Sequence, residues 1–190
     1  MHSIKTQRGI RLITGFCILG IAAWFLLSPA IPRVEGRPDP SNPTSSQSEK
    51  DVIAKVITDS IRWALTKDRA LAESTLAHDE DLFYFWTSST FTVKGWQQHV
   101  KYFDTWMDPR FKAVRTEVHD LRIHLSRSGD VAWYEATLDD VVEWDGKLGG
   151  GEDIRWTGVL EKRDGKWVIV QMHASLAADK VRESVLKDRK

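Results

Sequence analysis

The sequence predicts an α+β domain in which helices come first and a curved antiparallel sheet follows, and three observations support this expectation. Apolar residues recur at helical spacing in residues 51–77, with a break near residues 66–68, and again in residues 95–107. Residues 81–92 are rich in aromatic and hydroxyl side chains, as β-strands are. From residue 111 onward, strand-like segments are separated by glycine-containing turns at hairpin distances. Helices followed by a run of strands are typical of the α+β class.

An apolar segment, residues 12–31, precedes this domain, with basic residues on its N-terminal side and no acidic residue in residues 1–31. A helix of that length spans the roughly 30 Å hydrocarbon layer of a bilayer. The positive-inside rule then places residues 1–11 in the cytoplasm and the domain outside it, as a single-pass membrane protein. Ser28 and Ala30 also fit a signal-peptidase site, so secretion after cleavage near Ala30 is the alternative.

Residues 32–50 contain four of the six prolines together with several serines, which predicts a disordered linker. The folded domain is expected over residues 51–178, followed by a charged tail over residues 179–190.

Charge and cysteine content exclude several functions. The chain has 27 basic and 27 acidic residues, and the part after residue 31 has an acidic excess, which argues against a nucleic-acid partner. The single cysteine, Cys17, lies in the apolar segment, so the domain has no thiolate nucleophile and no disulfide. No converging set of histidines and acids has metal-site spacing, and no nucleotide fingerprint is present, so neither a metal nor a cofactor is predicted.

The most informative stretch is a predicted β-hairpin over residues 156–175 around an Asp164-Gly165 type I′ turn. This turn sets Arg163 opposite Lys166, and counting outward sets Trp156 opposite His173, with Gln171 on the same face. We expect that face to line a ligand pocket. The opposite face carries four apolar residues that we expect to form a dimer interface: Val159, Val168, Val170 and Met172.

A second hairpin, with its turn at Ser128-Gly129, pairs Ile123 with Tyr134, and alternation from there places Asp140 on the apolar face. A carboxyl group aimed into an apolar pocket has a raised pKa and can act as a general base. The alternative is that the strand leaves the core at Asp140 and the acid is solvated. His173 also has two interpretations, a polar group at the mouth of a pocket or a half-buried histidine hydrogen-bonded within the sheet.

Residues 158–175 (Gly-Val-Leu-Glu-Lys-Arg-Asp-Gly-Lys-Trp-Val-Ile-Val-Gln-Met-His-Ala-Ser), with Gly95-Trp96 and residues 129–133 in support, resemble the SnoaL-like branch of the nuclear transport factor 2-like superfamily. The resemblance covers residues 51–178. It implies a cone-like fold of about three N-terminal helices packed in a strongly curved sheet. It also implies use of the cone as a pocket for apolar small molecules or as an oligomerisation module. Some members are isomerases, cyclases or dehydratases, in which Tyr134 and Asp140 would have comparable roles.

Three functions remain open. The first is a membrane-tethered binding module for a small apolar ligand, and the second is a homodimerisation module built on the apolar face of the hairpin. The third is an enzyme with Asp140 as general base and Tyr134 or His173 as hydrogen-bond donor. The sequence favours binding or assembly over catalysis. The predicted pocket residues are Trp86, Tyr134, Trp156, Gln171 and His173.

Overall fold

The computed structural model describes residues 43–88 and 90–179. The predicted cytoplasmic segment, the predicted transmembrane helix and the first part of the predicted linker lie outside these residues, as does nearly all of the charged tail. None of the helices within the described ranges combines the length and the hydropathy needed to cross a bilayer.

Three helices occupy the N-terminal half of the described chain, as predicted. They are α1 (Pro43–Thr66), α2 (Arg69–Ser74) and α3 (Trp96–Met107). The first helix ends where Lys67 adopts a positive φ of 54°, and Asp68 caps the second by accepting a hydrogen bond from the backbone N–H of Leu71 at 3.0 Å. Ile53, Ile57 and Ile61 recur every four residues on α1 and are all buried, so one stripe of this helix faces the core.

The first helix begins earlier than the sequence predicts, at Pro43 instead of near residue 51. Proline is favoured in the first helical turn, where its missing N–H costs no hydrogen bond. Glu49 then accepts hydrogen bonds from Lys162 Nζ at 2.7 Å and from Trp167 Nε1 at 2.6 Å. These long-range contacts stabilise a helical start that the low apolar content of the segment does not indicate. Residues 43–50 are therefore helix and not linker.

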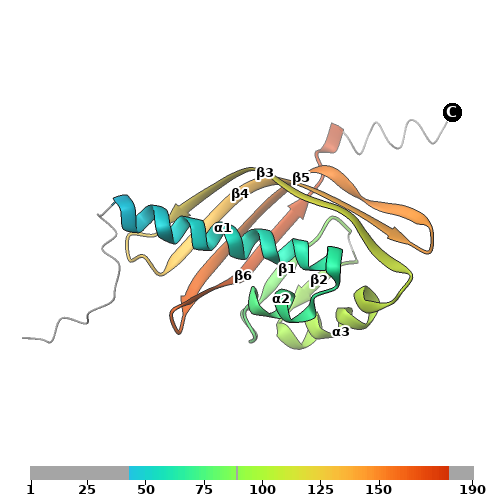
Figure 1. Ribbon diagram of the computed structural model, residues 1–190, viewed down its shortest axis with the longest axis horizontal. Coiled ribbons are helices and arrows are strands. Elements are labelled where there is room, and N and C mark those ends of the chain that lie inside the picture. The colour runs from blue at the N-terminus through green and yellow to red at the C-terminus, as the bar shows by residue number, and fades with distance from the viewer. Residues whose placement is uncertain (1–42, 89, 180–190) are drawn as a thin grey trace, which may run out of the picture. The chain divides into compact units, whose positions relative to one another are not determined.

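A single six-stranded sheet forms the rest of the domain, in the order β2-β1-β6-β5-β4-β3. Its strands are β1 (Phe83–Phe85), β2 (Thr92–Lys94), β3 (Phe111–Leu125), β4 (Val131–Trp144), β5 (Lys147–Arg163) and β6 (Lys166–Ser175). The one strand expected over residues 81–92 is thus two short strands. The sheet is also not wholly antiparallel, because β1 runs parallel to β6. Figure 1 shows the long strands curving, with α1 crossing one face and α2 and α3 beside its C-terminal end.

The curvature comes from register shifts in the long strands. Apolar alternation along β3 shifts by one residue near His119-Asp120, which predicts a bulge there. The structure has this bulge between His119 and Arg122, and Asp120 has a φ of 51°. A second shift lies between Leu138 and Asp140 where β4 pairs with β5. Three consecutive glycines at residues 149–151 indicate a flexible hairpin loop in the sequence, but in the structure they are part of β5. The turn is Asp145-Gly146, where both residues have the positive φ of a tight hairpin.

The closing hairpin, β5–β6, has the predicted turn. Asp164 and Gly165 have φ values of 50° and 78°, and Arg163 pairs with Lys166. The predicted pairing holds as far as Leu160 with Ile169.

Beyond that pair the predicted register is wrong, because Val170 is an extra residue on β6. Val159 pairs with Gln171 instead of Val170, and Trp156 pairs with Ala174 instead of His173. The bulge lets the consecutive apolar residues Ile169 and Val170 both be buried. It also exchanges the faces of every residue that follows on β6.

The core lies between α1 and the inner face of the sheet, the face that α1 covers. Leu138, Ile154, Trp156 and Leu160 are fully buried there against the stripe of isoleucines on α1. A smaller cluster joins Trp63 of α1, Ala72 of α2 and Phe103 of α3. The region between these two clusters holds the candidate site.

Candidate functional site

A cavity of about 270 Å³ opens between α1, α3 and the inner face of the sheet. This volume lies just below the range of roughly 300–1,000 Å³ typical of small-molecule pockets. Its walls are mostly apolar and aromatic, with a few polar side chains. The lining residues are Ser60, Ile61, Trp63, Ala64, Leu76, Tyr84, Trp86, Thr87, Phe91, His99, Trp106, Phe111, Asp140, Val142, Gly150 and Met172.

Asp140 is the one carboxylate in this lining. Strand alternation brings it to the inner face with Leu138 and Val142, as the sequence predicts, so the solvated alternative is not what the structure has. Burial raises the pKa of Asp140 to about 6, although a hydrogen bond from the Trp86 side chain opposes the shift. Gly150 packs against the Asp140 backbone, where a Cβ would come within 1.8 Å of the Asp140 carbonyl oxygen. Only glycine therefore lets β5 approach β4 this closely.

A second polar group in the cavity is the pair formed by Tyr84 of β1 and His99 of α3. The Tyr84 hydroxyl and His99 Nδ1 lie 2.8 Å apart, at hydrogen-bond distance. Burial lowers the pKa of His99 to about 4, so its imidazole is neutral at physiological pH, and burial also raises the pKa of Tyr84. His99 Nε2 is buried and has no hydrogen-bond partner among the described residues. The pair is therefore a neutral polar group in an aromatic wall.

The other predicted pocket residues divide into three groups. Trp86 lines the cavity as predicted. Tyr134 and Trp156 pack edge to face at 5.0 Å in the solid core and do not line the cavity, and neither the Tyr134 hydroxyl nor Trp156 Nε1 has a hydrogen-bond partner within the described ranges. Gln171 and His173 follow the bulge in β6 to the outer face of the sheet, where His173 is exposed. Of the residues predicted to form one pocket face, Trp156 therefore lies in the core, and Gln171 and His173 lie on the outer surface of the sheet.

The predicted dimer face is divided by the same bulge. Val170 and Met172 are buried on the inner side, and Met172 lines the cavity. Val159 and Val168 remain half-buried on the outer face. Only these two valines are placed where a second subunit could reach them.

Sequence reasoning missed Tyr84 and His99. Tyr84 lies in the aromatic segment expected to be a strand, and His99 lies on the apolar stripe of the expected helix, so both are interpreted as core residues. Their pairing depends on β1 lying beside β6 and on α3 packing over β1, which is tertiary information. The one sequence signal was a histidine within an otherwise apolar helical stripe.

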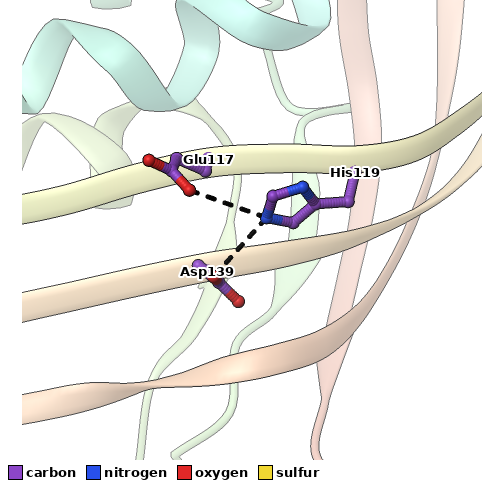
Figure 2. A group of neighbouring side chains, drawn as sticks. All are labelled: Glu117, His119 and Asp139. Atoms are coloured by element: carbon purple, nitrogen blue, oxygen red, sulfur yellow. Dashed lines mark ion pairs between the residues drawn. The ribbon is translucent and has the colours of Figure 1, made fainter.

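Three further side chains converge on the outer face, where β3 pairs with β4. Figure 2 shows His119 between Glu117 and Asp139, with Nε2 3.4 Å from Asp139 Oδ2 and 3.8 Å from Glu117 Oε2. Three potential metal-ligand atoms meet here. Asp139, however, accepts a backbone hydrogen bond from Asp153, which lowers its pKa, and an Arg115 guanidinium nitrogen lies 3.6 Å from its Oδ2. The positive charge of Arg115 opposes a cation, so we assign this group as an ion-pair cluster.

The cavity thus combines a carboxylate of raised pKa with a neutral phenol–imidazole pair and aromatic walls. Such a lining can bury an apolar molecule and hydrogen-bond its polar group at two places. The carboxylate can also accept a proton from a bound molecule, because its pKa lies close to physiological pH.

Comparisons with known proteins agree with this architecture. Residues 53–179 match the SnoaL-like domain family. None of the curated protein sequences compared with the chain matches it.

Solved structures of low sequence identity share the fold. An NTF2-like protein from Cytophaga hutchinsonii superimposes with a TM-score of 0.55 at 16% identity, covering 67% of this chain and 98% of that one. An NTF2-like protein of unknown function in nutrient uptake from Rhodospirillum rubrum gives 0.54 at 20% identity, covering 66% and 98%. The association domain of C. elegans CaMKII gives 0.53 at 19% identity, covering 70% and 98%.

Proposed function

The chain belongs to the SnoaL-like domain family, and from this premise we propose that its domain binds a small, largely apolar molecule in the cavity beside Asp140. One observation supports the proposal above the others: the cavity is open, aromatic-walled and provided with two separate polar anchors, Asp140 and the Tyr84–His99 pair. A filled cone would have no such space. The volume of about 270 Å³ suits a molecule of roughly one or two rings.

The test is calorimetric titration of the full chain with a small neutral probe, 2-phenylethanol, at millimolar concentration. Ala64 lines the cavity from α1, so Ala64→Phe is expected to fill it and abolish the binding. Leu65→Phe is the matched control, because the neighbouring Leu65 side chain is exposed on the same helix. Equal binding by both variants would locate the probe elsewhere and reject the proposal.

A second candidate function is proton-transfer catalysis in the same cavity. Asp140 would act as general base, because its desolvated carboxylate gains more by accepting a proton than a carboxylate in water does. The hydrogen-bond donor assigned on sequence to Tyr134 or His173 would instead be the Tyr84–His99 pair, which shares the cavity with Asp140. A donor there can stabilise negative charge developing on a bound molecule.

This candidate can be tested without the natural substrate by using 5-nitrobenzisoxazole. A base removes the proton from its ring carbon, the ring N–O bond breaks, and the resulting nitrophenolate is followed by absorbance. We expect a rate that rises through about pH 6, the pKa of Asp140, and that is lost in Asp140→Asn. A rate unchanged in Asp140→Asn, with an unchanged melting temperature, would remove Asp140 as the base.

We also propose that the domain forms a homodimer through the outer face of the sheet. Trp133, 45% exposed, lies there in register with Val159 on the neighbouring strand, and Val168 is half-buried on the same face. The likeness to a CaMKII association domain supports an assembly role for this fold. Light scattering at micromolar concentration tests it: Trp133→Lys is expected to convert a dimer to a monomer. A wild-type monomer would reject the dimer.

Attachment to the membrane through residues 12–31, with the domain extracytoplasmic, is part of the same proposal. The apolar length and the preceding basic residues support it. The mass of the protein extracted from membranes distinguishes a retained anchor from a product cleaved near Ala30.

A further inference from the structure

The ionisable side chains that line the cavity include an acid but no base of permanent positive charge. Its lining contributes one carboxylate, Asp140, and no lysine or arginine. The titratable groups that share it with Asp140 are Tyr84 from β1 and His99 from α3, and both are neutral at physiological pH. The lining residues from α1, β4, β5 and β6 add no further titratable group. Once ionised, Asp140 therefore gives the cavity a net negative charge.

This carboxylate has no cationic partner within the described part of the chain. Arg115, on the neighbouring strand, is paired with Glu152 and Asp139 on the other face of the sheet. Lys67, beyond the end of α1, donates to the backbone carbonyls of Met107 and Asp108. Among the described residues, the Trp86 side chain makes the one hydrogen bond that favours the ionised form of Asp140. Asp140 is half-buried, and a carboxylate removed from water without an opposite charge is costly unless something neutralises it.

The rest of the wall is aromatic to an unusual degree. Six aromatic side chains line the cavity: Trp63, Tyr84, Trp86, Phe91, Trp106 and Phe111. Several pack edge to face, such as Trp63 on Trp106 at 5.6 Å and Phe91 on Trp106 at 5.8 Å between ring centroids. Aromatic faces carry partial negative charge and attract cations within about 6 Å, most strongly where water is excluded.

We propose that the ligand of this cavity is a small organic cation, a protonated amine or alkylammonium group on an apolar body. The ammonium group pairs with Asp140, and the body lies against the tryptophan and phenylalanine walls. An anion is repelled by Asp140. A neutral ligand gains the apolar contacts and hydrogen bonds but leaves the carboxylate without an ion pair. The inference rests on the proposed binding function, because it identifies the class of ligand for the same cavity.

Three probes of similar shape separate the possibilities when titrated calorimetrically into the full chain. They are phenethylamine as the cation, 2-phenylethanol as the neutral molecule and phenylacetate as the anion. Near pH 7.5 we expect the cation to bind at least about tenfold more tightly than the alcohol, and the anion to bind most weakly. Near pH 5 the preference should shrink, because Asp140 is then mostly protonated.

Two variants of adjacent acids on β4 complete the test. Asp140→Asn is expected to remove the preference for the cation, so that phenethylamine no longer binds more tightly than 2-phenylethanol. Asp139→Asn changes the formal charge by the same amount on the opposite face, so it should keep the preference, and melting curves check that both variants fold.

The outcomes separate the inference from the function on which it rests. If 2-phenylethanol binds and Ala64→Phe blocks it, but phenethylamine binds no more tightly, the cavity is a ligand site and the cation inference is wrong. A preference retained in Asp140→Asn also overturns the inference. If none of the three probes binds, the proposed function fails and the inference fails with it.

Discussion

The hydroxyl of Tyr84 lies 2.8 Å from Nδ1 of His99, and this contact joins the short strand β1 to helix α3 at the wall of the cavity. Both groups are buried. The imidazole has no partner for Nε2 among the described residues, so the Tyr84 hydroxyl is its one hydrogen-bond contact there. Aromatic rings pack around this polar pair and hold it at the cavity wall.

Tyr84→Phe should destabilise the domain by about 1–3 kcal/mol, because it leaves a buried ring nitrogen of His99 without its partner while keeping the aromatic packing. Tyr102→Phe is the matched control, since Tyr102 is a half-buried aromatic residue that stacks on Trp106 in the same region. We expect its free energy of unfolding to stay close to that of the wild type. Urea denaturation of both variants measures the difference. Equal losses in the two variants would show that the 2.8 Å contact contributes nothing specific.

The stability of the domain should depend on pH through two opposed groups. His99 has a pKa of about 4 in the folded chain and 6.5 unfolded, so its contribution is complete above pH 6.5 and is lost as pH falls through 4. Asp140 has a pKa of about 6 folded and 3.8 unfolded, so its contribution is complete below pH 3.8 and is lost as pH rises through 6. Between about pH 4 and pH 6, unfolding takes up one proton at His99 and releases one at Asp140. The two groups therefore change the free energy of unfolding with pH by similar amounts in opposite directions, and their effects cancel.

Asp140→Asn removes one of these slopes. The free energy of unfolding of the variant should rise relative to that of the wild type by about 3 kcal/mol between pH 4 and 6.5. Urea titrations of the two proteins across this range give the difference, in which all other titrating groups cancel. A difference that does not change with pH would mean that Asp140 is not buried in the cavity.

The start of α1 gives a further prediction. Glu49 accepts hydrogen bonds from Lys162 and from the buried Trp167, and these bonds lower its pKa although desolvation opposes the shift. Glu49→Ala should cost about 1–3 kcal/mol, because it leaves the indole N–H of Trp167 buried without a partner. Asp51→Ala, two residues along on an exposed position, is the control and should change stability by less than about 0.5 kcal/mol. Chemical denaturation followed by tryptophan fluorescence makes the comparison.

Much of the fold could be predicted because local signals and tertiary packing agree. Short stretches of sequence are enough to predict the isoleucine stripe of α1, the turn at Asp164-Gly165 and the bulge near Asp120. Alternation along β4 also placed Asp140 on the inner face correctly, because the extra residues of the nearby register shifts lie on β3 and β5 and not on β4.

The predicted pairing of β5 with β6 is wrong beyond the point where a bulge adds one residue to β6. The extra residue Val170 moved His173 from the predicted pocket face to the outer surface, since side chains alternate with a period of two. The apolar run at residues 168–170 was the available sign, because strict alternation cannot bury two consecutive residues on one face. A histidine within an apolar helical stripe marked His99, but nothing local paired it with Tyr84, because that contact depends on which strand β1 joins.

Gly158 tests how tightly the inner face is packed. A Cβ built there would come within 2.6 Å of both the Gln171 carbonyl oxygen and Cε1 of Tyr134, and neither backbone nor a fully buried ring can move aside easily. Gly158→Ala should therefore cost about 1–3 kcal/mol through overpacking. Gly149→Ala, in the same strand, meets only a Val142 methyl at 3.8 Å.

The 3.8 Å distance from a Cβ at Gly149 to the Val142 methyl is an ordinary van der Waals contact. Gly149→Ala should therefore leave the free energy of unfolding unchanged or raise it by up to about 1 kcal/mol, because alanine restricts the unfolded chain. Thermal and urea unfolding of the two variants provide the measurement. A Gly158→Ala protein as stable as Gly149→Ala would mean that the Tyr134 ring does not lie over β5.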